Sequence, residues 1–342
     1  MRIGVLTGGG DAPGLNAAIR AVTRKALAEG MEVLGFRNGW LGVLEKDFAP
    51  LDMHSVSGIL YRGGTILGTS RTNPYSRQGG PEEIHENLRD LEVEALVPIG
   101  GEDTLGVARR LSQEGINLVG VPKTIDNDLY GTDYSIGFDT AVGVVMDSLD
   151  KLHPTAEAHH RVMLVEVMGR DAGWVATLGG LAGGADAVLV PEEPFSLEKL
   201  YARLRKRHEE LGKLFSIVVV AEGARPRDGG QAVVGGTQVD EFGHIRLGGI
   251  AHTLASQIEA ATGYETRVVV LGYLQRGGTP SAFDRVLATR LGVAAVELIK
   301  AGQFGVMVGL KGNRILPISL EESLSQTHSL DRDLYHLADL FY

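Results

Sequence analysis

The chain has 342 residues, 44% of them hydrophobic, so it can bury a large core, which we expect to be divided between two domains. Its net charge of -10 excludes the broad basic face that general nucleic-acid binding requires. The sequence has no cysteine, which excludes disulfides, thiol catalysis and Cys-ligated metals. No apolar stretch is long enough to span a membrane, and residues 1–6 have the pattern of a strand rather than of a signal peptide, so we expect a cytoplasmic protein.

The chain opens with an apolar run at residues 3–7, which predicts a strand. Three consecutive glycines begin the turn at 8–14, and a helical pattern starts at Leu15. A strand, a glycine-rich turn and a helix N-terminus together form an arrangement that binds phosphate. The spacing matches neither a dinucleotide fingerprint nor a Walker A loop. The turn is either a phosphate site or a tight connection without a ligand, and three glycines exceed what a turn needs.

A second strand is predicted at 31–36. We interpret Trp40, in the turn that follows, as a half-buried aromatic in a loop rather than as a lid. The segment 62–74 is rich in glycine and carries Arg62 and Arg71. Guanidinium groups and bare backbone N–H groups can converge on one anion, so this loop is either an anion site or a solvated loop.

A helix at 82–91 and a strand at 94–99 lead to a Gly-Gly turn that opens a helix at 105–113. Glu102 and Asp103 stand at this helix N-terminus. They are either caps that suit the helix dipole or ligands that hold Mg²⁺ on a phosphate.

The strand predicted at 116–121 ends at Pro122, because proline has no N–H for a strand ladder. The heptapeptide 122–128 (Pro-Lys-Thr-Ile-Asp-Asn-Asp) then places one cation, two carboxylates, an amide and a hydroxyl side by side. A carboxylate beside a lysine can take a proton from a hydroxyl while the lysine holds an anion. The alternative is a polar turn that caps a helix, with Asp126 or Asp128 as the N-cap.

Strands and helices thus alternate through residues 1–137, which predicts a doubly wound parallel sheet. The polar turns at 8–14, 62–73, 100–104 and 122–128 would lie on the same edge of that sheet. The alternation then restarts. We expect helices at 139–152, 172–182, 197–211, 249–261 and about 281–300, strands at 161–168, 187–190, 216–220 and 267–271, a hairpin around 231–234 and 244–247 within the excursion 223–249, and a short terminal region.

The polar turns supply phosphate cradles, a carboxylate pair for a metal and a carboxylate that can act as a base. Arginines occur in both halves, at Arg71, Arg161, Arg170, Arg267 and Arg276. These groups are what phosphoryl transfer requires, because that reaction depends on positioning and charge neutralisation. A sugar phosphate as acceptor would explain the arginines of the second half.

The sequence resembles the 6-phosphofructokinase family over essentially its full length. The resemblance rests on seven separated motifs in the same order: residues 8–16, 62–71, 100–104, 122–128, 168–170, 222 and 275–278. It implies an α/β fold of two doubly wound domains with mainly parallel sheets. Residues 1–137 with about 275–325 would bind the phosphoryl donor and Mg²⁺, and residues 138–274 with about 326–342 would bind fructose 6-phosphate.

The resemblance also implies residue roles. Asp126 would be the base that takes the proton of the sugar 1-hydroxyl, with Lys123 and Thr124 beside it. Fructose 6-phosphate would be held by Thr124, Asp126, Arg161, Met168, Gly169, Arg170, Glu222, Arg267, Tyr273 and Arg276. The donor would be held by Gly10, Arg71, Gly101, Glu102, Asp103, Thr104 and Lys123, and Mg²⁺ by Glu102 and Asp128. Because Arg161 and Arg267 match arginines that reach a neighbouring subunit in this family, we expect a homodimer or homotetramer with shared active sites.

Three residues bear on the donor. ATP-dependent members usually have glycine where this chain has Asp103 and Lys123, and histidine where it has Tyr273, so the chain is most similar to the pyrophosphate-dependent and short actinobacterial-like branch. A carboxylate at 103 would crowd and repel an α-phosphate, and Lys123 would replace part of the charge neutralisation. ATP remains the alternative donor. A non-catalytic sugar-phosphate sensor is disfavoured, because Asp126, Arg170 and Arg276 are all present.

Overall fold

A computed structural model describes residues 1–227, 234–239, 241–243 and 245–340. They divide into two compact units. Unit 1 holds the described residues within Met1–Thr140, Asp240–His244 and Arg276–His328, and unit 2 holds those within Ala141–Val239, Ile245–Gln275 and Ser329–Tyr342. The described part of the chain contains no helix that is both long and apolar enough to cross a membrane.

Unit 1 is built on a seven-stranded sheet in the order β13-β12-β5-β4-β1-β2-β3. Its strands are β1 (Arg2–Thr7), β2 (Glu32–Phe36), β3 (Phe48–Pro50), β4 (Ala95–Gly100), β5 (Val119–Pro122), β12 (Val306–Lys311) and β13 (Arg314–Ser319). The five inner strands are parallel and the two edge strands are antiparallel. The chain leaves β1 toward β2 on one side and returns with β4 on the other, which places a topological switch point at the carboxyl ends of β1 and β4.

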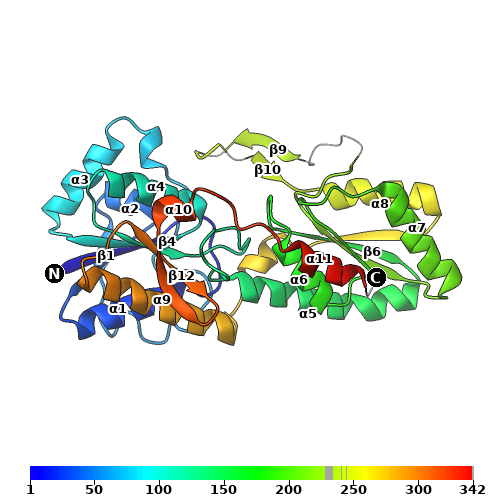
Figure 1. The fold of residues 1–342 in the computed structure, drawn as a ribbon, viewed down its shortest axis with the longest axis horizontal. Helices are drawn as coiled ribbons and strands as arrows, with labels where there is room; N and C mark the ends of the chain where they lie inside the picture. Colours follow the sequence, from blue (N-terminus) through cyan, green and yellow to red (C-terminus); the bar gives the residue numbers. More distant parts are fainter. Residues whose placement is uncertain (228–233, 240, 244, 341–342) are drawn as a thin grey trace. The chain divides into compact units, whose positions relative to one another are not determined.

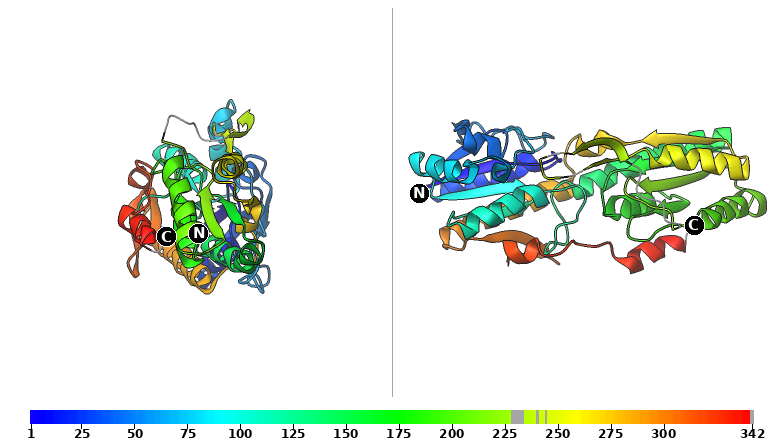
Figure 2. Two further views of the ribbon diagram at one scale, coloured as in Figure 1. Left: turned by 90° about the vertical axis from the view of Figure 1, so that its right-hand side faces the viewer. Right: turned by 90° about the horizontal axis from the view of Figure 1, so that it is seen from above.

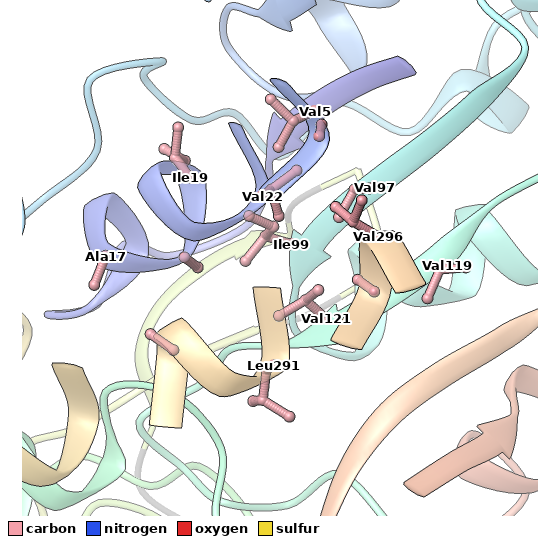
Figure 3. Packing of buried hydrophobic residues seen from close by; sticks show 14 of the residues in the cluster. Val5, Ala17, Ile19, Val22, Val97, Ile99, Val119, Val121, Leu291 and Val296 are labelled. Atoms are coloured by element: carbon pink, nitrogen blue, oxygen red, sulfur yellow. The ribbon is translucent and has the colours of Figure 1, made fainter. Parts of the chain in front are cut away.

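Helices cover both faces of this sheet (Figure 1). One face carries α1 (Leu15–Ala28) and α9 (Ala282–Lys300), and the other carries α2 (Trp40–Leu44), α3 (Gly80–Asp90), α4 (Glu102–Gln113) and α10 (Leu320–Ser323). Figure 3 shows the first core, in which strand residues such as Val97 and Val121 pack with Val22 of α1 and Leu291 of α9. Burial on both faces explains why the inner strands read as continuous apolar runs.

Unit 2 has a four-stranded parallel sheet in the order β11-β6-β8-β7, with β6 (Val162–Val167), β7 (Ala187–Leu189), β8 (Ser216–Ala221) and β11 (Thr266–Val270). Helices α7 (Leu197–Arg205) and α8 (Ile250–Thr262) pack on one face. Helix α6 (Trp174–Ala182) and most of α5 (Phe138–His159) lie on the other (Figure 1). The C-terminal helix α11 (Arg332–Asp339), red in Figure 2, contacts α6 and β7.

The two mainly parallel sheets confirm the predicted fold class. Several boundaries differ from the prediction. Helix α5 continues to His159 although Pro154 lies inside it, and α7 ends at Arg205 in a π-helical turn, Lys206–Glu210. The expectation of only a short terminal region after residue 300 was wrong, because this part of the chain forms the hairpin β12-β13. The expected hairpin within 223–249 is present as β9 (Val234–Val239) paired with β10 (Ile245–Leu247), whereas residues 231–233 and 244 lie outside the described residues. Short 3₁₀ turns occur at Pro74–Ser76 and Gly272–Arg276.

Candidate active site

The glycine turn after β1 lies at the switch point of the unit 1 sheet. The N–H of Gly8 donates to the carbonyl of Ile99 in β4 at 3.0 Å, and Gly9 has a φ of +76°, which glycine adopts without strain. The N–H of Gly9 donates to Ser70 O at 3.0 Å, and Thr69 Oγ1 donates to Gly9 O at 2.5 Å. The segment 62–73 is therefore hydrogen-bonded to the first glycine turn, as the sequence predicted for two turns on one sheet edge.

A buried amide holds the other end of that segment. The Nδ2 group of Asn16 donates to the carbonyls of Arg62 and Gly63 at 3.1 and 3.2 Å, and its Oδ1 accepts from Ile66 N at 2.8 Å. Arg71 lies at the exposed end of the segment. The two glycine-rich segments thus form one surface, from which an arginine and several backbone groups can reach an anion.

The head of α4 packs directly beneath the glycine turn. Thr104 is 2% exposed, and a side chain added at Gly8 or Gly100 would overlap its side chain. The indole N–H of Trp40 donates to Thr104 O at 3.3 Å. The expectation that Trp40 is half-buried in a loop was wrong, because it is buried in α2. Glu102 and Asp103 occupy the first turn of α4, where the helix dipole stabilises negative charge.

Lys123 lies buried under the glycine turn. Only 2% of it is exposed, and its Nζ donates to Gly8 O at 2.9 Å and to Gly10 O. Burial, followed by the nearby Arg276 guanidinium, lowers the pKa of Lys123 to about 7. This lysine holds the shape of the turn and places a titratable cation beside it.

Asp126 follows on the same turn and is 6% exposed. Its N–H donates to Thr124 Oγ1 at 3.1 Å. Its Oδ1 is buried and has no hydrogen-bond partner among the described residues. A buried carboxylate oxygen without a partner is rare, and it marks a position at which a ligand or a proton can be accepted.

The segment that follows the 122–128 turn packs back onto it. Asn127 Nδ2 donates to Asp133 O at 3.1 Å, and its Oδ1 accepts from Ser135 N at 2.9 Å. Helix α5 begins only at Phe138. The alternative in which Asp126 or Asp128 caps a helix is therefore wrong.

A second buried carboxylate joins the end of this segment to α9. Asp284 is fully buried, and it accepts from Gly137 N and from the N–H and hydroxyl of Thr140 at 2.8, 2.8 and 2.5 Å. Thr140 Oγ1 in turn accepts from Ser281 N at 2.9 Å. Asp284 therefore links the head of α9 to the residues that return from the 122–128 turn.

Arg276 belongs to unit 1 and lies on the side of the glycine turn. Its Nη1 donates to Asp11 O at 3.0 Å, and a side chain added at Gly10 would meet the guanidinium at 2.5 Å. The sequence predicted Arg276 as a ligand of the sugar phosphate. The structure places it next to the predicted donor residues Gly10 and Lys123.

Unit 2 brings a second group of predicted residues together. Residues 168–170 follow β6, Glu222 follows β8, and these strands are neighbours in the sheet. The N–H of Arg170 donates to Glu222 Oε1 at 3.1 Å, and Arg170 has a φ of +49°, a strained conformation that occurs often at ligand sites. The fully buried Gln275 accepts from Met168 N at 3.3 Å. The loop is thus held from two sides.

Arg161 and Arg267 lie at the opposite end of the same sheet. Arg161 precedes β6 and Arg267 is the second residue of β11, so the length of β6 (about 20 Å) separates them from Met168–Arg170. Both arginines contact Glu265, Arg161 at 2.9 Å. Within one chain they do not join the residues after β6 and β8. Tyr273 is 72% exposed.

The family model described as "Phosphofructokinase" matches residues 2–299 of the chain. The chain belongs to the phosphofructokinase family. This phosphofructokinase is 54% identical to the "Pyrophosphate--fructose 6-phosphate 1-phosphotransferase" of Amycolatopsis methanolica, over 100% of both chains. It is 50% identical to the "ATP-dependent 6-phosphofructokinase 3" of Streptomyces coelicolor, over 99% of each.

A solved structure of Pichia pastoris phosphofructokinase superimposes on this phosphofructokinase with a TM-score of 0.84 and 31% identity. The match covers 99% of this chain and 36% of that chain, so this chain spans about a third of the length of the Pichia one. The match agrees with the α/β architecture described above.

The carboxylates of this phosphofructokinase can be tested for their fit to Mg²⁺. In the described ranges, no three His, Asp or Glu side chains gather into a site that could hold a metal by themselves. Mg²⁺ is usually bound by one or two carboxylates together with waters and substrate phosphates. Glu102 follows β4 and Asp128 follows β5, which are neighbouring strands, so the oxygen ligands present fit an ion that arrives with a phosphate.

Several supporting residues escaped sequence reasoning. Asn16 and Gln275 lie inside the matched motifs, but nothing in those motifs indicates that their amides hold distant backbone groups. Asp284 gave no local signal, and Trp40 was noted only as an aromatic in a loop, because their partners lie far away along the chain. A buried polar side chain can be recognised as holding a distant backbone group in place only when the fold shows its hydrogen-bond partner.

Proposed function

We propose that this phosphofructokinase transfers a phosphoryl group from pyrophosphate to the 1-hydroxyl of fructose 6-phosphate, giving fructose 1,6-bisphosphate and phosphate. The observation that carries the proposal is Asp126 Oδ1, a buried carboxylate oxygen with no protein partner in the described part of the chain. It lies on the same turn as Lys123, beneath a glycine turn suited to phosphate. The name of the Amycolatopsis relative supports this donor and acceptor.

The chemistry follows from these positions. The oxygen of the 1-hydroxyl attacks one phosphorus of pyrophosphate while its proton passes to Asp126 Oδ1. The bond from that phosphorus to the bridging oxygen breaks, and inorganic phosphate leaves. Thr124 orients Asp126 by accepting its N–H. Because breaking the anhydride bond of pyrophosphate releases little more free energy than the ester bond of the product retains, we expect the reaction to run in both directions.

On the donor side, unit 1 supplies the N–H groups of Gly10 and of the Gly101–Thr104 helix start, with Arg71 and Lys123 as cations. Bare N–H groups and cations together neutralise the charge of a bound pyrophosphate. Glu102 and Asp128 would hold Mg²⁺, which supplies further charge neutralisation on the phosphate oxygens. The carboxylate of Asp103 would disfavour a longer polyphosphate, because it would crowd and repel an α-phosphate.

On the acceptor side, unit 2 supplies Met168, Gly169, Arg170 and Glu222, and we retain Arg276 and Tyr273 as predicted contributors. We propose that Arg161 and Arg267 act on the site of a partner subunit in a homodimer or homotetramer. Their position at the opposite strand ends supports this. The exposure of Val270, Tyr273 and Leu274, which follow Arg267 in sequence, also supports it. They are 49%, 72% and 67% exposed in the single chain, and large exposed apolar residues often mark surfaces that a partner subunit covers. A cytoplasmic location, where these sugar phosphates occur, is part of the proposal.

The second candidate is the same transfer from ATP. It is favoured by the Streptomyces relative named for ATP, at 50% identity. The test is the rate of fructose 1,6-bisphosphate formation with pyrophosphate and with ATP at equal Mg²⁺. We expect pyrophosphate to give a kcat/KM at least about 100-fold higher, equivalent to about 2.7 kcal/mol of discrimination. A higher kcat/KM with ATP would replace the first proposal by the second.

The variant Asp103→Gly tests the reason for that preference. Removing the carboxylate makes room for an α-phosphate and removes its repulsion, so we expect kcat/KM for ATP to rise about tenfold or more. Asp103→Asn serves as the matched control, because it removes the charge of the same side chain without making room. If Asp103→Gly left ATP use unchanged, the steric argument would be wrong.

A further inference from the structure

The last two residues of unit 1, Thr327 and His328, form a strap against the 122–128 turn. Thr327 pairs with Leu129 in an antiparallel bridge, and the N–H of His328 donates to Asp128 O at 2.8 Å. The imidazole adds a third contact, since its Nδ1 lies 2.9 Å from Asn127 O. A carbonyl oxygen only accepts, so Nδ1 carries the proton in this contact.

The residue held by the strap has an unusual backbone. Asn127 has a φ of +54°, in the left-handed region that residues other than glycine seldom adopt. Its side chain is held by Asp133 and Ser135, whereas its carbonyl is held by His328. The two sets of contacts therefore hold different parts of the same residue.

The carbonyl of Asn127 controls the direction of Asp128. The peptide unit between them is planar, so the position of the Asn127 oxygen determines where the nitrogen and Cα of Asp128, from which its side chain leaves, lie. Asp126 is joined to the other side of Asn127. A change in the Asn127 backbone would therefore move the two carboxylates of the turn relative to one another.

We propose that His328 is a positioning residue, which acts through its Nδ1–H on the carbonyl of Asn127 and so orients Asp126 and Asp128. The proposal rests on the proposed function, in which Asp126 is the base and Asp128 serves Mg²⁺. The strap ends where the chain leaves unit 1, and the next residues, from Ser329 onward, belong to unit 2. The strap is thus the last part of unit 1 in contact with the turn.

Two amide variants of His328 distinguish a positioning role, through the hydrogen bond to Asn127 O, from a role in packing alone. In His328→Asn the amide nitrogen is as many bonds from Cα as Nδ1, so it can donate to Asn127 O. In His328→Gln the nitrogen matches Nε2 instead, and the bond to Asn127 O is lost. Both variants are neutral, polar and smaller than or similar to histidine. A role in packing alone would favour Gln, which fills more of the space.

The first readout is steady-state kinetics with pyrophosphate and fructose 6-phosphate. We expect His328→Gln and His328→Ala to lower kcat about tenfold, as for the loss of one buried hydrogen bond, and to raise the half-saturating Mg²⁺ concentration. The KM for fructose 6-phosphate should stay within about twofold. His328→Asn should retain at least about a third of the wild-type kcat. Equal losses in Asn and Gln, or an unchanged Ala variant, would overturn the proposal.

The second readout does not depend on activity. Amide hydrogen exchange reports local opening, so peptides that cover residues 124–129 should exchange faster in His328→Gln and His328→Ala, and at the wild-type rate in His328→Asn. If the wild type failed to use pyrophosphate, the proposed function would fail, while this exchange pattern would still decide the role of His328. Unchanged exchange in all three variants would contradict that role.

Discussion

At the scale of single residues, Lys123 shows how the proposed donor site depends on burial. Its ammonium is enclosed by the carbonyls of Gly8 and Gly10, and burial lowers its pKa to about 7 from the ordinary value of 10.5. A lysine in this state is charged below pH 7 and loses its charge as the pH rises through 7. Pyrophosphate binding that uses this charge should weaken over the same range.

We therefore expect kcat/KM for pyrophosphate in the wild type to fall on the alkaline side of a pKa near 7. In Lys123→Arg the guanidinium stays charged, so this limb should be missing even if the larger side chain lowers the overall rate. The measurement is the pH profile of kcat/KM between pH 6 and pH 9 at constant ionic strength. Profiles of the same shape for both proteins would show that Lys123 does not titrate in this step.

At the scale of elements, the return segment 133–137 connects the 122–128 turn to α9. Asp284 accepts from Gly137 and Thr140, and Ser135 donates its hydroxyl to Thr124 O at 2.7 Å. Burial raises the pKa of Asp284 to about 6, although its hydrogen bonds act in the opposite direction. Above that pH it is an ionised buried carboxylate with its hydrogen-bond donors in place.

Replacing Asp284 should destabilise the protein and the turn together. In Asp284→Asn, one oxygen becomes an NH₂ group that faces a donor, so we expect a loss of about 2–4 kcal/mol of unfolding free energy at pH 8. A carboxyl group with a raised pKa stabilises the wild type most at low pH. The loss of unfolding free energy in Asp284→Asn should therefore be largest below about pH 4 and become smaller as the pH rises to about 6. Urea unfolding monitored by circular dichroism measures it. A loss below about 0.5 kcal/mol would contradict the role given to Asp284.

The elements also show what the sequence could and could not predict. The glycine turns after apolar strands were predictable, because strand, turn and helix are adjacent in the chain. Lys123 and Asp126 were predictable as candidates, because the cation and the carboxylates occur within one stretch of seven residues. The hairpin β12-β13 was missed although its two-residue turn, Gly312-Asn313, is a hairpin signal, because its outer strand is mostly exposed and lacks a continuous apolar run. Asn16, Gln275, Asp284 and His328 act on partners brought near only by folding.

At the scale of the whole molecule, the distribution of arginines bears on the proposal of more than one subunit. Arg161 and Arg267 lie about 20 Å along the strands from Arg170, too far for a single sugar phosphate to reach both ends. If each site needs Asp126 from one subunit and Arg267 from another, two inactive variants can restore each other.

Mixing Asp126→Asn with Arg267→Ala subunits tests this sharing. In a mixed dimer, one site combines an intact Asp126 with an intact Arg267, and the other carries both defects. After co-unfolding and refolding, we expect a random mixture of dimers to recover about a quarter of the wild-type kcat per site, well above either variant alone. Recovery no greater than the sum of the two separate variants would place Arg267 outside a shared site.

The central claim is that Asp126 is the base of phosphoryl transfer from pyrophosphate, and Asp126→Asn tests it most directly. The amide keeps the size of the side chain but cannot take the hydroxyl proton. We expect kcat with pyrophosphate and fructose 6-phosphate to fall about 10²–10⁴-fold, while the melting temperature and the KM for fructose 6-phosphate stay close to those of the wild type. A kcat within about tenfold of the wild type, in a folded variant, would contradict the account.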